Sequence, residues 1–119
     1  MNIKVVVFAL VMTASMGAQG ESLDTGESFK RGSSILESCE RESWFDKGYC
    51  SGYIIGVSDA AVTLARWEGF AESICTPQGV TSGQLQKVVV KYLNENPEKL
   101  HFAADSLVLN ALEGAFPCE

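Results

Sequence analysis

Four cysteines and one histidine, His101, are the side chains of this 119-residue sequence best suited to nucleophilic or metal chemistry. Nucleophilic catalysis needs a base held against the nucleophile, and zinc needs several converging ligands. A single histidine beside the start of a helix is typical of a solvated surface residue. Glu68 with Glu72, and Glu37 with Arg41, have the spacing of surface charges on a helix. We therefore expect no catalytic residue, no metal and no cofactor, and a binding protein that is not an enzyme.

The first twenty residues have the features of a secretory signal peptide. Lys4 supplies one positive charge, Val5 to Met12 is an unbroken apolar run, and small residues stand at Ala18 and Gly20. The pattern predicts a signal peptide over residues 1–20, cleaved near Gly20, and a periplasmic protein if the host is a diderm bacterium. The apolar run is too short to span a bilayer, so we expect no membrane partner.

The remaining chain is predicted to be one helical domain, 33–119, after a flexible polar leader at 21–32. Ser34 and Glu37 form a capping-box pattern that opens a short helix through Cys39. The sequence from Trp44 to Gly48 is interpreted as a bend, and the most apolar helix is expected from about Tyr49 to Arg66. Gly52 and Gly56 weaken that helix, which predicts close packing of a neighbouring helix against them.

A second pair of helices is predicted from Thr81 to Ala115. Thr81 and Gln84 match a capping box, and a helical stripe follows at Leu85, Val88, Val89 and Tyr92. Three consecutive valines from Val88 also suit a strand, but the spacing of the lysines favours a helix. Asn96-Pro97 is expected to end this helix and to cap the next one, whose apolar face runs from Leu100 to Ala115. The fold class is therefore all-α, a small four-helix bundle of two antiparallel hairpins.

The helix ends suggest how the cysteines pair. Cys39 follows the first helix and Cys50 starts the second, while Cys75 and Cys118 flank the neighbouring ends of the later hairpin. Of the three connectivities that four cysteines allow, Cys39 with Cys50 and Cys75 with Cys118 is the one in which both disulfides close local hairpins. So small a domain gains much of its stability from such cross-links.

The charge balance bears on the partner. Nine Lys and Arg face fifteen Asp and Glu, a formal net charge of −6. Repulsion from phosphates argues against nucleic acid and anionic lipid, and favours a basic protein partner. Solubility of an exported protein explains the same acidity equally well.

The segment between Arg66 and Gly79 combines aromatic and acidic residues. Trp67 and Phe70 at the end of a helix have two interpretations. They pack over the core, as most such residues do, or they anchor a protein partner with Glu68 and Glu72 at the rim.

Four stretches carry a resemblance that covers about 33–118. They are Cys50–Asp59, Cys75–Leu85, the junction from Lys91 to Pro97, and Ala111–Cys118. Together they resemble the Rap/Tai-type immunity proteins of type VI secretion systems. The resemblance implies a small exported, disulfide-bonded helical domain, often a homodimer, that binds and inhibits a peptidoglycan amidase toxin by placing a loop at its active-site cleft.

We therefore expect a periplasmic immunity protein, with Trp67, Glu68, Phe70 and Glu72 facing the toxin. The alternative is a small periplasmic acid-stress or holdase-type chaperone, which exposes apolar surface when its carboxylates are protonated. A chaperone binds many unfolded clients, whereas an immunity protein binds one folded toxin.

Overall fold

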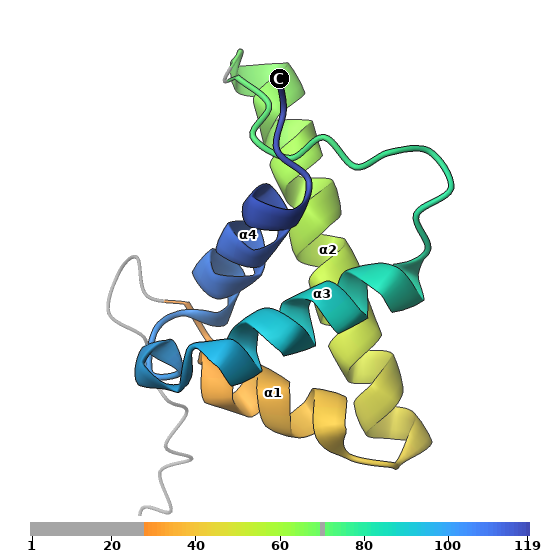
Figure 1. Cartoon of the computed structure of the whole chain (residues 1–119), viewed down its shortest axis with the longest axis vertical. Helices are drawn as coiled ribbons and strands as arrows, with labels where there is room; N and C mark the ends of the chain where they lie inside the picture. The colour runs from red at the N-terminus through yellow and green to blue at the C-terminus, as the bar shows by residue number, and fades with distance from the viewer. Residues whose placement is uncertain (1–27, 70) are drawn as a thin grey trace, which may run out of the picture.

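The computed structural model describes residues 28–69 and 71–119 (Figure 1). The predicted signal peptide and positions 21–27 of the predicted leader lie outside these residues. The elements are α1 (Gly32–Glu40), α2 (Trp44–Glu68), α3 (Ser82–Glu95), the 3-10 helix η1 (Pro97–Lys99) and α4 (Ala104–Ala115). Within the described residues, extended backbone pairs only as two isolated β-bridges. The predicted class, a small all-α bundle held by disulfides, is confirmed.

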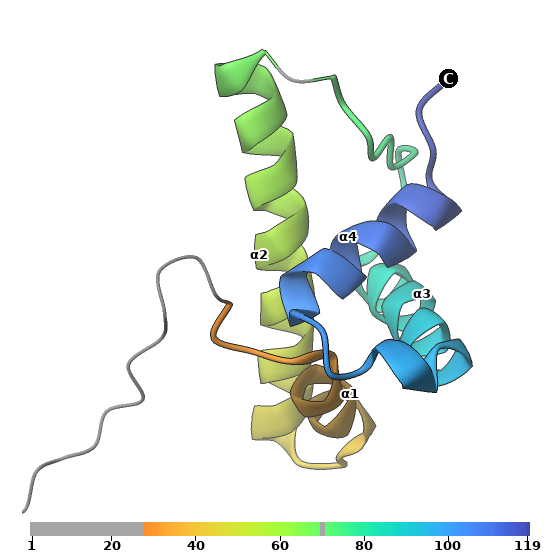
Figure 2. The same ribbon diagram turned by 90° about the vertical axis from the view of Figure 1, so that its left-hand side faces the viewer.

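The long helix α2 is the support for the other three helices. Figure 2 shows α2 as an upright rod with α1, α3 and α4 on one side of it. Residues one turn apart on that side of α2, Cys50, Ile54 and Ser58, are buried. They meet a core whose other members come from α1, the segment after α2, α3 and α4: Ile35, Ile74, Val89, Leu93, Ala104, Leu107, Val108, Ala111 and Leu112.

Helix α1 begins at Gly32, two residues earlier than predicted, and Ser34 does not cap it. The N–H groups of Gly32 and Ser33 instead donate to the carbonyl oxygens of Phe102 and Leu100, at 3.0 and 2.9 Å. Free N–H groups at a helix start need acceptors, and here a segment distant in sequence supplies them. The end of the predicted leader, at Lys30 and Arg31, is part of the same junction, since the Lys30 carbonyl accepts from Ala104 and Arg31 forms a bridge with Ala103.

Helix α2 begins at Trp44, so the predicted bend from Trp44 to Gly48 is wrong. Ser43 caps the helix, because its hydroxyl oxygen accepts from the Asp46 N–H at 3.1 Å. A serine at this position with an acidic residue in the first turn is a favourable start. The helix ends at Gly69, whose φ of 67° is left-handed and costs glycine little.

Helix α3 forms with the predicted capping box. Gln84 N–H donates to the Thr81 hydroxyl at 3.2 Å, and Thr81 N–H donates to the Gln84 side chain at 2.8 Å. The helical interpretation of the valine run is therefore confirmed. The expected second helix begins later, at Ala104, after η1 and a turn. Asn96 does not cap it: its side chain donates to the Tyr92 carbonyl at 2.8 Å and so belongs to the end of α3.

The structure contains two disulfides, with the pairing expected from the helix ends. Cys39–Cys50 joins the last turn of α1 to α2, and Cys75–Cys118 joins the segment after α2 to the segment after α4. Each has a Cα–Cα distance of 5.0 Å, within the usual range. The later hairpin is not a side-by-side antiparallel pair, because α3 and α4 diverge from the corner at η1 (Figures 1 and 2).

The glycines of α2 do not have the predicted role. A Cβ built at Gly52 or Gly56 would meet no atom within 4 Å, so no helix packs closely there. Close packing occurs instead at Gly32, where a Cβ would collide with Leu107 and lie 3.2 Å from the Leu100 carbonyl oxygen. The glycine that the fold requires for space is therefore at the start of α1.

Alanine substitutions should distinguish the open space at Gly52 and Gly56 from the close packing at Gly32. We expect Gly52→Ala and Gly56→Ala each to raise the free energy of unfolding by about 0.5–1 kcal/mol, because alanine is the better helix former. We expect Gly32→Ala to lower it by about 1–3 kcal/mol through overpacking. Urea unfolding followed by circular dichroism measures all three. Destabilisation by Gly56→Ala would show that α2 has a close neighbour at that position.

Candidate functional site

The end of α2 carries exposed apolar and acidic side chains, which we call the α2-end surface: Leu64, Trp67, Glu68 and Glu72. Trp67 is 81% exposed and Leu64 is 53% exposed, and both glutamates are exposed. The interpretation that Trp67 packs over the core is therefore wrong. Phe70, the other predicted anchor, lies outside the described residues.

These side chains are exposed because backbone contacts hold the segment after α2 away from them. The chain turns at Gly69, and the next buried residue among those that the structure describes is Ile74. Ile74 forms a β-bridge with Pro117, and the Cys75 N–H donates to the Phe116 carbonyl at 2.8 Å. The Cys75–Cys118 disulfide adjoins both contacts. The returning segment is thus tied to the end of α4 and does not cover Trp67.

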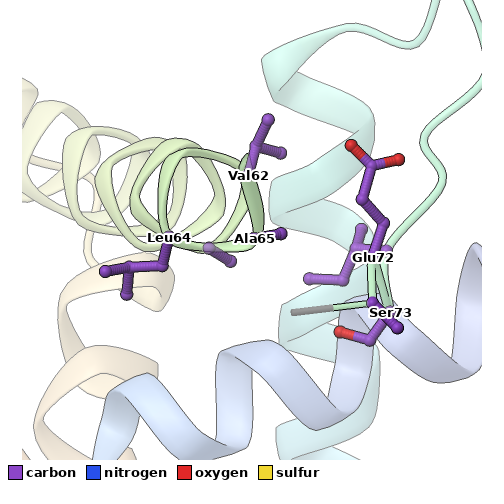
Figure 3. A pocket seen from close by; sticks show the side chains of 8 residues that line it. Val62, Leu64, Ala65, Glu72 and Ser73 are labelled. Carbon is purple, nitrogen blue, oxygen red and sulfur yellow. The ribbon is translucent and has the colours of Figure 1, made fainter. Parts of the chain in front are cut away.

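A small hollow of about 140 Å³ lies between the end of α2 and the returning segment (Figure 3). Figure 3 shows Val62 and Ala65 on the side of the helix nearer to Glu72 and Ser73, while the Leu64 side chain extends away from them. The volume of the hollow is several times the about 30 Å³ that a water molecule occupies in the liquid, so the hollow has room for one apolar side chain. Its apolar wall and the adjoining carboxylates suit a side chain flanked by a basic group.

A second, larger space runs beside it along α2, and we call it the α2–α4 groove. Its volume is about 460 Å³, and it shares Ala61 and Leu64 with the hollow. The rest of its lining is mostly small or apolar: Gly52, Tyr53, Gly56, Val57, Ala60, Asp105 and Leu109. Sequence reasoning missed this groove, although the four-residue spacing of the two glycines was the available signal.

The other end of α2 presents aromatic side chains that sequence reasoning also missed. Trp44 is 92% exposed and Phe45 is 80% exposed, and the Phe45 and Tyr49 rings stack with centroids 6.5 Å apart. Lys30 Nζ lies 5.6 Å from the centre of the Tyr49 ring. Spacing of four between Phe45, Tyr49 and Tyr53 was the signal, but interpreting Trp44–Gly48 as a bend concealed it.

The titratable groups of the described residues are arranged as surface charges. Lys47 Nζ donates to Glu42 at 2.9 Å, and this bond with the lysine charge lowers the pKa of Glu42. Arg41 pairs with Glu37 on the surface of α1. Burial, with the nearby Asp105 charge, raises the pKa of Tyr53 to about 12. His101 is exposed, and its ring lies beside Phe102. These positions suit recognition of a partner more than proton transfer.

The described residues offer neither a metal site nor a membrane-spanning helix. All four cysteines are in disulfides. No group of three His, Cys, Asp or Glu side chains among residues 28–69 and 71–119 could hold a metal ion. None of the described helices combines the length and apolar character that a bilayer span requires. Two disulfides fit a chain that folds in an oxidising compartment.

The fold and its exposed surfaces define a small helical binding protein stabilised by disulfides. The family model of the Rap1a immunity proteins matches residues 31–118, so the chain belongs to this family. Membership confirms the resemblance to Rap/Tai-type immunity proteins, and such proteins are toxin-binding proteins, not an enzyme family. No curated protein and no solved structure matches the chain.

Proposed function

We propose that this immunity protein acts in the periplasm, where it binds and inhibits a peptidoglycan amidase delivered by a type VI secretion system. Such a toxin cleaves peptidoglycan outside the inner membrane, so its inhibitor has to be exported as well. The α2-end surface is the proposed contact. The observation that carries this choice is the exposure of Trp67, two residues after Ala65, which lines a hollow together with Glu72.

An exposed tryptophan beside carboxylates has the composition of a protein interface. Binding energy concentrates in a few buried anchors, most often Trp, Tyr and Arg, surrounded by residues that exclude water. Trp67 exposes a large apolar side chain to water, and the exposed carboxylates of Glu68 and Glu72 follow it along the chain. Those carboxylates favour a basic rim on the toxin and speed association through long-range attraction.

Capture from the periplasm tests the function itself. The full-length chain, tagged and expressed in the host so that its signal peptide directs export, should retain one exported amidase. The purified mature chain should stop that enzyme from hydrolysing peptidoglycan. Retention of many unfolded proteins, with stronger binding at acidic pH and no inhibition, would instead support the holdase alternative.

Trp67→Ala should weaken binding to the captured amidase by about 2 kcal/mol or more, because a central anchor is lost. That corresponds to about a thirtyfold rise in Kd, which calorimetry resolves. Phe102→Ala is the control, since Phe102 is another exposed aromatic residue, lies after η1 and away from both ends of α2, and its loss should leave binding unchanged. Equal affinities for the wild type and Trp67→Ala would remove the α2-end surface from the interface.

We also propose that the protein forms a homodimer through the aromatic end of α2. Neighbouring exposed Trp44 and Phe45 support this choice, since adjoining large apolar side chains favour association. Light scattering should give twice the chain mass for the mature protein, and the chain mass for a variant with both Trp44→Ser and Phe45→Ser. A wild type that stays monomeric at about 100 μM would contradict the proposal, since stable interfaces bind well below that concentration.

A further inference from the structure

The α2–α4 groove has an unusual wall, because part of it is bare backbone. Gly52 and Gly56 are exposed, and a Cβ at either would meet nothing within 4 Å. Both glycines weaken a helix interior, and no packing among residues 28–69 and 71–119 requires them. In other proteins, a glycine often lets a ligand approach the backbone closely. The bare backbone leaves room for another molecule to lie close against α2.

The groove is continuous with the proposed toxin contact. Ala61 and Leu64 line both the groove and the hollow at the end of α2. A toxin seated on the α2-end surface therefore meets the groove next along the same helix. One partner can cover both, whereas a second, separate protein would compete for the shared wall at Leu64.

The charges near the groove select the occupant. Asp105 lines it, with its Oδ1 accepting from the Ser28 hydroxyl at 2.7 Å, and Asp59 is exposed between Gly56 and Ala60. The ion pairs among the described residues are Arg41–Glu37, Lys47–Glu42 and Lys91–Glu95, so neither aspartate has a basic partner there. Lys30 Nζ lies 5.6 Å from the centre of the Tyr49 ring, one turn before Tyr53.

We propose that the α2–α4 groove is a second contact for the toxin, and that it takes an apolar side chain of that protein with a lysine or arginine beside it. The inference rests on the proposed function. The apolar part lies against Gly56, Val57 and Leu109, and the cation reaches Asp105 or Asp59. The raised pKa of Tyr53 is consistent with this arrangement, since it reflects burial and the Asp105 charge.

A small-molecule titration tests the chemistry without the toxin. Nitrogen–proton correlation spectra of the mature protein would be followed with n-hexylammonium chloride and, separately, with sodium hexanoate at the same ionic strength. We expect the Gly52 and Gly56 amide signals to shift, with at least threefold weaker binding of hexanoate. Asp105→Asn should remove most of that preference. Equal shifts with both probes, or none, would overturn the proposed selectivity.

A second experiment measures the affinity of groove variants for the amidase that the immunity protein captures. Gly56→Met fills the groove while keeping a good helix former, and should raise Kd for the amidase at least tenfold. Gly48→Met is the matched control, because Gly48 is also in α2 with nothing within 4 Å of an added Cβ, and does not line the groove. It should bind as the wild type does. Thermal melts check that both variants fold.

The outcomes separate this inference from the function on which it rests. If the wild type binds the amidase and Gly56→Met binds it equally well, the groove contact is wrong and the inhibitor function stands. If Gly56→Met only converts a dimer to a monomer, the occupant is a second copy, and the toxin contact is again wrong. If the wild type does not bind the amidase, the proposed function fails and takes the toxin assignment with it, even where hexylammonium binds.

Discussion

The link between the segment after α2 and the end of α4 is the constraint on which the binding surface depends. It consists of the Cys75–Cys118 disulfide, the Ile74–Pro117 bridge and the hydrogen bond from Cys75 to Phe116. On the loop-entropy model, a disulfide with sequence separation 43 contributes about 4 kcal/mol. Helix α4 is packed into the core, so the link fixes the returning segment beside α2. The hollow exists because that segment stays there.

One-sided packing of α2 explains where the exposed surface lies. Core residues follow one face of α2 at Cys50, Ile54 and Ser58, and the three other helices cover that face. A small domain has little apolar material with which to cover a 25-residue helix on all sides. The outer face is left with Trp67 at one end, Phe45 at the other and glycines between them. Those positions are therefore available to partners.

Local patterns predicted what local interactions determine. The capping box of α3, the all-α class and the Cys39–Cys50 pairing could be predicted because each follows from nearby residues. The Cys75–Cys118 pairing was predicted from an antiparallel hairpin that α3 and α4 do not form, and this disulfide joins the segments that follow α2 and α4. The start of α1 could not be predicted, because its N–H groups bond to carbonyls 67 and 70 residues along the chain, a pairing with no local pattern. Trp67 was ambiguous for a similar reason: its exposure depends on the path of the segment after Gly69. The groove needs α2 and α4 together, so two glycines alone suggested packing.

The central claim is that oxidised Cys75 and Cys118 hold a preformed surface that binds the toxin, and its most direct test is the affinity of the double variant Cys75→Ala with Cys118→Ala for the amidase. Preorganised loops bind more tightly because less ordering is needed on association. The account predicts at least about tenfold weaker inhibition at a temperature where circular dichroism shows the helices intact. Unchanged inhibition by the folded double variant would contradict it.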